Sequence, residues 1–417
     1  MTRQGAKKRL ETAREIKHLV AGYYQEAMEA RSHGKPVGWL PPMNGAIELF
    51  YAMDLQPVFP ENWSPLSAAF GLAPQNFQVS ESRGYSMDLC GYLRNILGYV
   101  DGLMKQEDGF PLRLPEPDML ISFGGGCIPA MKIFQALENR FPGAAVFRAD
   151  LPQVAIEDIE EHHIAYAVSV MKDLISFLEE KTGRRLDVDR LREAVSLSDQ
   201  ACKLWDEIMS CRSTVPSPFS AAEIGLMFVM VTLQGTQRAV DFLARVRDEV
   251  REKSRLKQGV IPREELRLFW DNIPPWYNLN LFNYFEQFNA VVVAETYSAA
   301  WSQRLDPERP FESLAYKSLI SYPLVSCLCM KRRIEMVVKA CREYKIDGAV
   351  FHNNKSCKPI TLGQVLIKEA LEKELGVPSV IIDGDHMDER NFSMGQFQTR
   401  VEAFMEMLKE RKGAGTG

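Results

Sequence analysis

Two kinds of hydrophobic pattern alternate along the chain, and the first kind marks residues 35–155. Short apolar runs, LPEPDMLISFGGG and AAVFRADLP, flank MKIFQALENRF, in which apolar residues recur every three or four positions. Short buried runs are typical of strands, whereas the longer spacing predicts an amphipathic helix. Strand, helix and strand in this order form a βαβ unit, which favours a parallel α/β domain over residues 35–155. Within it, LQPVFPENW predicts a short strand and a loop, and residues 81–100 predict one helix.

In the middle of the chain, the apolar residues follow helical spacing only. Apolar residues recur at this spacing in IEDIEEHHIAYAVSVMKDLISFLEEKTG and in VDRLREAVSLSDQACKLWDEIMSC. The breaker PSPF then precedes a further helical stretch. We therefore predict a helical region over residues 156–274, and a polar helix over about residues 4–32 within a separate N-terminal segment, residues 1–34.

The alternating pattern returns in residues 275–417. Strand-like runs NAVVVAET, DGAVFHNN and VPSVIIDGD alternate with helical stretches, the last of which is GQFQTRVEAFMEMLKERK. This predicts a second parallel α/β domain. The expected fold class is therefore α/β, with two Rossmann-like domains and a helical middle region.

Charge and composition exclude several kinds of function. The 417 residues carry 50 basic and 55 acidic side chains, a formal net charge of −5, which gives no electrostatic case for nucleic-acid binding. The basic clusters at residues 7–9 and 331–333 read as solvated helix surface. No stretch reaches the roughly 20 apolar residues that span a bilayer, and no apolar signal core begins the sequence, so we expect a cytoplasmic protein without membrane contact.

Three of the eight cysteines stand at the ends of predicted elements. Cys90 lies in the helix predicted over residues 81–100, Cys127 lies where a strand becomes a helix, and Cys357 lies in a loop after DGAVFHNN. Their spacings of 37 and 230 residues are too long for a local zinc loop, so any shared site must be assembled by the fold. Ligands of open parallel sheets gather beyond the carboxyl ends of strands, where we expect Cys127 and Cys357 to meet.

The other cysteines have simpler explanations. Cys202, Cys211 and Cys341 fall within helical stretches and read as buried apolar side chains. Cys327 and Cys329 form a C-x-C pair before a helix, for which core packing is the favoured interpretation.

The surroundings of the three cysteines favour an iron–sulfur cluster. Residues 124–126 are all glycine, which allows close backbone approach, and the amides of the turn can point toward thiolate and sulfide charge. Three thiolates would bind three irons of a [4Fe–4S] cube and leave the fourth open. A zinc ion held by three cysteines is the alternative.

At these residues the chain resembles a known family. GYSMDLCGYLRNILG, the Cys127 turn, SCKPITLGQ and the tail VPSVIIDGDHMDERNFSMGQFQTRVEAFMEML are similar, in order, to 2-hydroxyacyl-CoA dehydratases and class I benzoyl-CoA reductases. The resemblance covers nearly the whole chain. It implies two Rossmann-like domains, a [4Fe–4S] cluster on Cys90, Cys127 and Cys357, a paralogous or identical cluster subunit as partner, an acyl-CoA substrate, and a separate ATP-hydrolysing iron–sulfur activator. A double-cubane cluster is a lesser alternative.

Within this family, YAMDLQPVFPENW followed by SRGYSMDLC is more similar to the benzoyl-CoA reductase branch. The aromatic residues before it would suit a flat apolar substrate, although core packing explains them equally well; they are Trp39, Phe50, Tyr51, Phe59 and Trp63. We thus expect a subunit of an activator-driven oxidoreductase that reduces benzoyl-CoA in anaerobic aromatic degradation. A radical-based 2-hydroxyacyl-CoA dehydratase is the alternative, and a non-catalytic two-domain binding or scaffold module is a further one. The sequence has no G-x-x-x-x-G-K-[ST] and no G-x-G-x-x-G motif, so ATP hydrolysis and nicotinamide binding are not expected.

Candidate proton-transfer groups follow from position alone. His352 stands five residues before Cys357, on what reads as the same loop, and Glu61 stands in the PENW loop. Either can equally be a loop residue that forms hydrogen bonds. The acidic residues in IIDGDHMD resemble a metal-binding cluster, but helix capping is the favoured interpretation; they are Asp383, Asp385 and Asp388.

Overall fold

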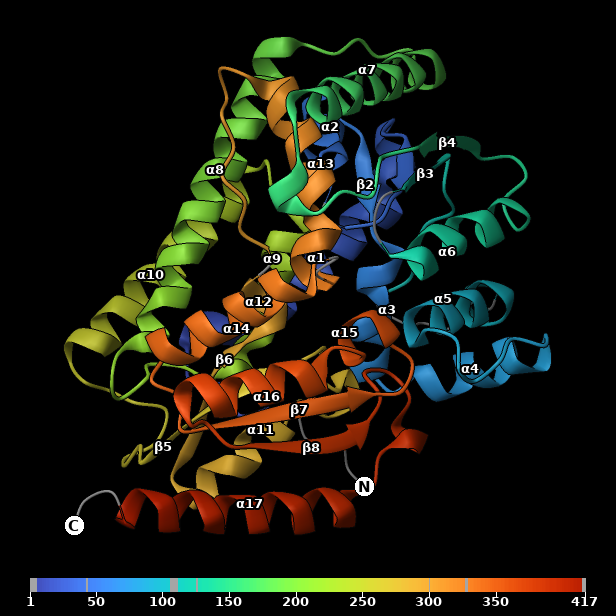
Figure 1. Cartoon of the computed structure of the whole chain (residues 1–417). Coiled ribbons are helices and arrows are strands. Elements are labelled where there is room, and N and C mark those ends of the chain that lie inside the picture. Colours follow the sequence, from blue (N-terminus) through green and yellow to red (C-terminus); the bar gives the residue numbers. More distant parts are fainter. Residues whose placement is uncertain are drawn as a thin grey trace.

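Two parallel sheets of four strands each form the framework of the protein (Figure 1). The computed structural model describes residues 6–414 except 43, 106–111, 125–126, 300 and 327–328. The strands are β1 Val37–Trp39, β2 Gln56–Val58, β3 Met119–Phe123, β4 Ala145–Ala149, β5 Leu266–Asp271, β6 Ala290–Glu295, β7 Gly348–Asn354 and β8 Ser379–Gly384. The strand orders are β2-β1-β3-β4 and β6-β5-β7-β8, so both sheets have the order 2-1-3-4 when their strands are counted along the chain. The predicted α/β fold with two parallel-sheet domains is confirmed.

Helices connect and cover these strands. The α-helices are α1 Glu11–Glu29, α2 Ala46–Ala52, α3 Pro60–Ala69, α4 Ala73–Ser82, α5 Gly91–Asp101, α6 Ile128–Glu138, α7 Glu161–Thr182, α8 Val188–Ser210, α9 Met227–Thr232, α10 Gln237–Arg255, α11 Leu281–Tyr284, α12 Thr296–Ala299, α13 Pro310–Ser326, α14 Met330–Glu343, α15 Lys358–Thr361, α16 Gln364–Leu375 and α17 Met394–Ala414. The 3-10 helices are η1 Ala30–His33, η2 Leu103–Lys105, η3 Ile156–Asp158, η4 Cys211–Ser213, η5 Ala221–Leu226, η6 Trp276–Asn278, η7 Phe285–Phe288 and η8 Glu389–Asn391.

The second sheet separates two hydrophobic cores. Successive side chains of a strand point to opposite faces. Leu268 and Trp270 of β5 accordingly join a core with α17, whereas Phe269 joins a core on the opposite face with α14 and α16. Cys341 of α14 belongs to the second of these cores, as predicted. Helices on both faces explain why every residue of β5 and β6 is buried.

Sequence analysis missed two strands, β1 and β5. β1 has only three residues, and β5 lies at Leu266–Asp271, inside the segment predicted to be helical, because its continuously buried run carries no alternation. β5 pairs with β6 and β7, so the second sheet includes chain that precedes residue 275. The predicted domain bounds at residues 34, 155 and 274 stay a prediction.

Helix α13 ties the later part of the chain to the earlier part. It packs against α7 and α8, and in Figure 1 it lies beside α2, although it also contacts α15, which follows β7. Lys317 of α13 forms a buried ion pair with Glu48 of α2, with a Nζ–Oε1 distance of 2.6 Å. The same ammonium group donates to Gln234 Oε1, also at 2.6 Å. A charged contact thus joins segments that are 269 residues apart.

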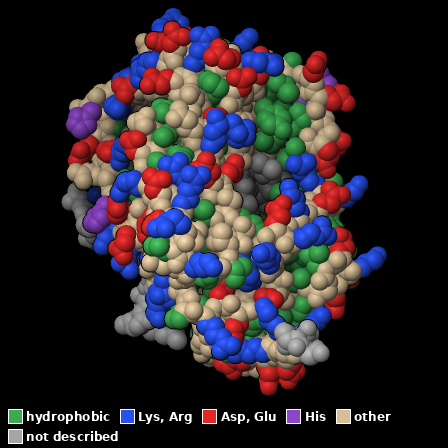
Figure 2. All heavy atoms as spheres, turned by 90° about the vertical axis from the view of Figure 1, so that its left-hand side faces the viewer, with side chains coloured by type: hydrophobic (Ala, Val, Ile, Leu, Met, Phe, Trp, Pro, Cys, Tyr) green, Lys and Arg blue, Asp and Glu red, His purple; other side chains and the backbone are tan. Residues whose placement is uncertain are grey.

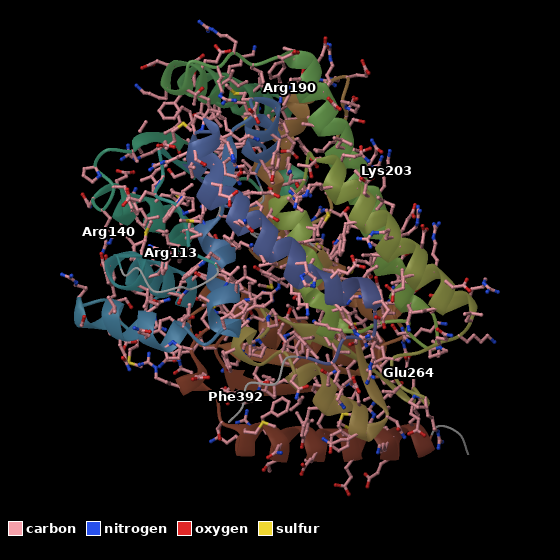
Figure 3. All side chains as sticks on the ribbon, turned by 180° about the vertical axis from the view of Figure 1, so that it is seen from behind. Arg113, Arg140, Arg190, Lys203, Glu264 and Phe392 are labelled. Atoms are coloured by element: carbon pink, nitrogen blue, oxygen red, sulfur yellow. The ribbon has the colours of Figure 1, made fainter. Side chains whose placement is uncertain are left out.

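Helix α1 crosses the back of the molecule between the first sheet and α10 (Figure 3). The Tyr23 hydroxyl donates to the carbonyl of Pro57, within β2, at 2.6 Å, and Glu15 pairs with Arg245 of α10. The helix begins at Glu11, later than the predicted residue 4. The single helix predicted over residues 81–100 is also wrong: α4 ends at Ser82 and α5 begins at Gly91, because Gly84 adopts a φ of 90° and turns the chain between them.

The surface carries charges of both signs. Figure 2 shows Lys and Arg interspersed with Asp and Glu over the face that bears α8 and α10. The interpretation of residues 331–333 as solvated surface is wrong for Arg333, which is only 2% exposed and forms an ion pair with Asp271 at the end of β5. None of the helices in the described part of the chain combines the length and apolar character needed to cross a membrane.

Candidate functional site

The three cysteines singled out from the sequence line one cavity of about 660 Å³. Each stands directly before a helix: Cys90 before α5, Cys127 before α6 and Cys357 before α15. The carbonyl of each cysteine accepts the first backbone hydrogen bond of its helix, from Arg94, Met131 and Thr361 at 3.0, 3.2 and 3.3 Å. The prediction that Cys90 lies inside a helix is therefore wrong, because it precedes its helix.

The cavity lies beyond the carboxyl ends of strands from both sheets. Cys127 follows β3 and Cys357 follows β7, which occupy the same place in the shared strand order. Glu61 follows β2, Ile273 follows β5 and Tyr297 follows β6, and all three line the same cavity. This is the position at which parallel sheets bind ligands, so the expected meeting of two strand-end crevices is confirmed.

The three thiols influence one another in an apolar environment. Burial is the main cause that raises the pKa of each thiol, to about 12 for Cys127 and Cys357. Charge on a neighbouring thiol adds to the rise in each case, Cys127 acting on Cys90, Cys357 on Cys127, and Cys90 on Cys357. Amides in the first turn of each following helix oppose the rise, as Arg333 does for Cys357. Thiols in such a site become thiolates when a metal binds them.

The arrangement of the donors bears on which metal group could fit. In the described ranges, no three His, Cys, Asp or Glu side chains are grouped as ligands of one metal ion. The alternative predicted from the sequence, a single zinc ion held by three cysteines, therefore has no preformed site within the described ranges. A four-iron cluster bonds each cysteine to a different iron, so its ligands surround a space instead of converging on one point. Three thiols from three chain segments around one cavity fit that requirement.

Glu61 is the acidic residue on the cavity wall. It is the second residue of α3, which begins at Pro60, so the predicted PENW loop is in fact the start of a helix. Its charge raises the pKa of Cys127, of Tyr297 and, more weakly, of Cys90. A carboxylate within electrostatic reach of the thiols is thus built into an otherwise apolar wall.

Two tyrosines complete this part of the wall. Tyr92 and Tyr297 share a hydrogen bond, and the Tyr92 hydroxyl also accepts a hydrogen bond from Trp276 Nε1 at 2.6 Å. Burial raises the pKa of both phenols, so both carry a proton at neutral pH. Together with Glu61 they supply hydroxyl and carboxyl groups beside the cysteines.

His352 is placed differently from its prediction. It lies within strand β7 instead of the Cys357 loop, is 2% exposed, and does not line the cavity. Its Nδ1 donates to the Ile273 carbonyl at 2.7 Å, and burial lowers the pKa of the imidazole. Since Ile273 does line the cavity, His352 supports the wall from behind. The geometry gives no support to its predicted proton-transfer role.

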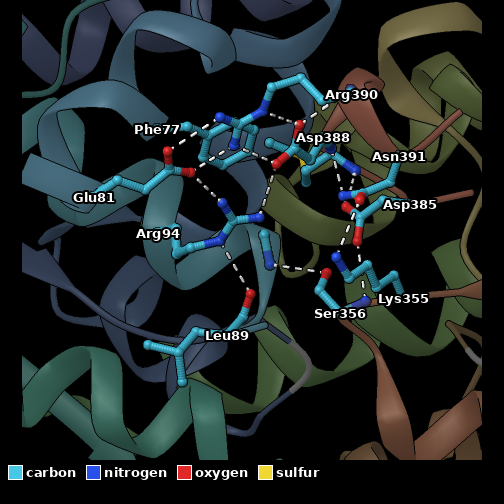
Figure 4. Close-up of polar contacts among 12 residues, drawn as sticks. Phe77, Glu81, Leu89, Arg94, Lys355, Ser356, Asp385, Asp388, Arg390 and Asn391 are labelled. Carbon is cyan, nitrogen blue, oxygen red and sulfur yellow. Dashed lines mark hydrogen bonds and ion pairs between the residues drawn. The ribbon is translucent and has the colours of Figure 1, made fainter. Parts of the chain in front are cut away.

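A chain of polar contacts fixes the Cys90 and Cys357 loops against each other (Figure 4). The Gly91 amide donates to Ser356 Oγ at 3.1 Å, and the Ser356 amide donates to Asp385 Oδ2 at 3.0 Å. A Cβ on Gly91 would lie 2.6 Å from Met387 Cβ, so this approach requires glycine. The residues next to two of the cysteines are therefore held by the segment after β8.

A second group of contacts anchors the same region from the side of α4 and α5. Arg94 is fully buried; it pairs with Asp388 at 3.2 Å and with Glu81 at 2.9 Å, and its Nε donates to the Leu89 carbonyl (Figure 4). Arg390 pairs with the same two carboxylates. The result is a partly buried network of four charges that fixes the residues immediately before Cys90.

Of the three acidic residues of IIDGDHMD, Asp388 caps a helix, as favoured, whereas Asp385 and Asp383 form other contacts. Asp388 caps η8 by accepting from the Arg390 amide, and Asp385 accepts from the Met387 and Asp388 amides. Asp383 accepts from Asn353 and pairs with Arg400. Of the C-x-C pair, Cys329 stands directly before α14 and is partly exposed, and Cys327 lies outside the described residues, as do Gly125 and Gly126.

A second cavity of about 630 Å³ adjoins the first. The two cavities share five lining residues, which are Pro42, Glu61, Tyr92, Tyr297 and Trp301. The remainder of the second wall comes from α3, from η5 and α9, and from the segment around η6. The cysteines thus stand at one end of a longer, two-part space.

Sequence analysis did not identify the tyrosines or Trp301. Tyr297 is the second residue after strand β6, so the rule that pointed to Cys127 and Cys357 would also have found it. Tyr92 stands two residues after Cys90, in the first turn of α5. Trp301 reaches the cavity wall because of the path that the chain takes after β6, and no local sequence pattern predicts that path.

Comparisons with known proteins find relatives over nearly the whole chain. The model of a family described as 2-hydroxyglutaryl-CoA dehydratase, D-component, matches residues 43–408. The chain is 27% identical over 402 residues to the (R)-phenyllactyl-CoA dehydratase alpha subunit of Clostridium sporogenes, with 96% of each covered. It is 27% identical over 411 residues to the alpha subunit of the lactoyl-CoA dehydratase of Anaerotignum propionicum, with 94% of each covered. It is also 27% identical over 417 residues to one of the benzoyl-CoA reductase subunits of Thauera aromatica, covering 96% of this chain and 95% of the relative.

Proposed function

Because the chain belongs to the 2-hydroxyglutaryl-CoA dehydratase D-component family, we propose that it is the iron–sulfur subunit of an enzyme that acts on an acyl-CoA thioester. The relatives are subunits of acyl-CoA dehydratases and of an acyl-CoA reductase, and each matches over nearly its full length. The observation that carries the proposal is the meeting of three thiols from three chain segments around one apolar cavity at the ends of both sheets.

In this proposal Cys90, Cys127 and Cys357 hold a [4Fe–4S] cluster, which would supply single electrons of low potential to the substrate. The apolar walls keep water away from the cysteines. Gly91 and Ser356 set the distance between the Cys90 and Cys357 loops. The chain's own contribution is therefore to position the thiols and to exclude water.

Dehydration of a 2-hydroxyacyl-CoA is the reaction that the wall supports best. Loss of water requires a group that protonates the departing hydroxyl, and a carboxyl is suited to hold or move that proton. Glu61 occupies such a position beside the thiols, with the Tyr92 and Tyr297 hydroxyls next to it. We assign the transfer of this proton to Glu61, and the orientation of the substrate oxygens to the two phenol hydroxyls.

Reduction of an aromatic acyl-CoA is the second candidate, supported by the apolar, partly aromatic lining of both cavities. The aromatics that favoured this branch in the sequence do not add to the argument. Trp39, Phe50, Phe59 and Trp63 are at most 1% exposed in the main core, and none of the five aromatics lines either cavity. Core packing accounts for them.

The proposal includes two protein partners. The relatives are themselves named as single subunits of their enzymes, two of them as alpha subunits, which supports a related second subunit for this chain. Ile128 and Leu362, which closely follow Cys127 and Cys357, are 62% and 79% exposed, as expected for residues that another protein covers. The absence of a G-x-x-x-x-G-K-[ST] motif is consistent with ATP hydrolysis by a separate activator.

Metal analysis of protein purified without oxygen tests the cluster. We expect about four iron and four sulfide per chain, and their loss in Cys90→Ala, Cys127→Ala and Cys357→Ala. Cys202→Ala is the matched control, since Cys202 is buried in α8 away from the cavity and its loss should leave iron unchanged. Zinc alone, or no metal in any variant, would overturn the proposal and favour a binding or scaffold module.

Product analysis separates the two reactions. With a partner subunit and an activator, a dehydratase converts a 2-hydroxyacyl-CoA to an enoyl-CoA, whereas a reductase converts benzoyl-CoA to a dienoyl-CoA. Glu61→Gln should reduce dehydration by about 10²-fold or more while iron content stays unchanged, because the amide cannot supply the proton. Dienoyl-CoA as the only product would establish the second candidate instead.

A further inference from the structure

The second cavity has the position and lining of a ligand pocket, since it adjoins the cysteine cavity and its wall is mostly apolar with a few polar groups. It shares Glu61, Tyr92, Tyr297 and Trp301 with the cysteine cavity, so a molecule inside it can present one end to the thiols. Ala69, an exposed residue of α3, also lines it, so the cavity reaches the protein surface there.

The charge of the pocket restricts what can enter. Among the lining residues that the structure describes there is no Lys, Arg or His, and Glu61 is acidic. Most of the wall is made of apolar side chains, among them Leu66, Met227 and Phe228. A carboxylate buried here would lose its hydration without gaining a cation and would also meet the charge of Glu61, whereas an alkyl or aryl group would gain from leaving water.

One polar group lacks a partner at the junction of the two cavities. Trp301 is 5% exposed, and its Nε1 has no hydrogen-bond partner within the described part of the chain. A buried N–H without an acceptor is unfavourable, and an oxygen of a bound ligand would relieve it. Trp301 lines both cavities, so this donor lies where a ligand would pass from one to the other.

We propose that the second cavity binds the acyl chain of the substrate and selects apolar acyl groups, branched aliphatic or aromatic, over acyl groups that end in a carboxylate. The inference rests on the proposed function, which it narrows to one substrate class. The acyl chain occupies the space between α3 and α9, and Trp301 Nε1 donates a hydrogen bond to an oxygen near the thioester. Glu61 stands where the chain meets the cysteines.

Calorimetric binding to the full chain tests this selectivity. The probes are CoA, 3-phenylpropanoyl-CoA, 4-methylpentanoyl-CoA and glutaryl-CoA, none of which carries a 2-hydroxyl group to be eliminated. We expect the two apolar thioesters to bind at least about tenfold more tightly than CoA, and glutaryl-CoA to bind no more tightly than CoA. Trp301→Phe keeps an aromatic ring without the N–H, and should weaken both apolar thioesters about fivefold while CoA binding is unchanged.

Two variants that each add one positive charge, inside and outside the cavity, give the matched control. Leu66→Arg adds a cation to the wall and should raise the affinity for glutaryl-CoA relative to 3-phenylpropanoyl-CoA by about tenfold. Phe70→Arg adds the same charge at the end of the same helix, on a residue that is 57% exposed and does not line the cavity, and should leave that ratio unchanged.

Equal binding of glutaryl-CoA and 3-phenylpropanoyl-CoA to the unaltered protein would overturn the inference. So would apolar thioesters that bind no better than CoA, or identical effects of the two arginine variants. Iron and sulfide contents of the same preparation report separately on the cluster, so failure of the pocket is distinguishable from failure of the proposed function.

Discussion

Replacing Lys317 with methionine should destabilise the fold strongly, because it leaves a buried carboxylate without its cation. Lys317 and Glu48 are 3% and 0% exposed, and the pair joins α13 to α2. After the change, Glu48 Oε1 keeps a hydrogen bond from Ser198 Oγ at 2.7 Å, whereas Oε2 has no partner within the described residues even in the unaltered protein. Methionine retains most of the aliphatic volume, so the change removes chiefly the charge.

The expected size of the effect follows from burial. Breaking a fully buried ion pair by removing one partner lowers the free energy of unfolding by about 3–5 kcal/mol. The Gln234 carbonyl oxygen also loses its donor. Natural proteins have about 5–15 kcal/mol of stability in total, so this one change should remove a substantial share. Glu48→Gln in addition to Lys317→Met replaces the unpaired charge with a neutral amide, so the double variant should be more stable than Lys317→Met alone.

Urea unfolding followed by circular dichroism measures these differences. The matched control is Arg245→Met, which breaks the Glu15–Arg245 pair, whose members are 45% and 55% exposed. Exposed pairs contribute about 0–1 kcal/mol, so the control should change little. If Lys317→Met also lowered the free energy of unfolding by less than about 1 kcal/mol, or if the double variant were the least stable of all, the reasoning from burial would be refuted.

Three further predictions concern packing, pH and the cysteine loops. Gly98→Ala should lower the free energy of unfolding by about 3 kcal/mol or more, since its Cβ would lie 1.8 Å from a backbone oxygen of α4; Gly22→Ala, which meets no atom within 4 Å on α1, should raise it by about 0.5–1 kcal/mol in the same urea assay. Burial lowers the pKa of His352, so its contribution to stability is present above its unfolded pKa of about 6.5 and is lost as pH falls below that value. Between pH 7 and pH 5 the free energy of unfolding should fall by up to about 1.4 kcal/mol per pH unit because of this group. His352→Gln should reduce this fall, whereas substitution of the exposed His18 should not. Ser356→Ala removes the acceptor of the Gly91 amide and should speed iron loss to a chelator about fivefold; an unchanged rate would show that this contact does not hold the loops.

Local patterns were sufficient to predict the parts of the fold and site that depend on neighbouring residues. The strand before Cys127 and the strand before Cys357 are short apolar runs, and the strand-end rule then placed both cysteines at one crevice. β5 was missed because a strand buried on both faces has no polar alternation to distinguish it from a helix. His352 was misplaced for a related reason, since β7 extends to Asn354 through residues that are polar in sequence but mostly buried in the sheet.

The contacts that set the distance between the Cys90 and Cys357 loops illustrate what sequence alone cannot supply. Asp385 was predicted to cap the segment that follows it, and it does accept the Met387 and Asp388 amides. Its other oxygen accepts the amide of Ser356, 29 residues earlier, and Ser356 Oγ in turn accepts the amide of Gly91, 265 residues earlier. The carboxylate of Asp385 forms both the local contact and the long-range contact in the same way, by accepting backbone amides. The residue type predicts the local contact, whose partners are neighbours in the sequence, but it does not indicate the distant partner. Burial opposes the charge of Asp385, but the neighbouring His386 and the hydrogen bonds from Ser356, Met387 and Asp388 lower its pKa, so the carboxylate stays charged while holding both loops. The cysteines can thus be recognised from the sequence, but the spacing of their loops is set by contacts that form only when the chain has folded.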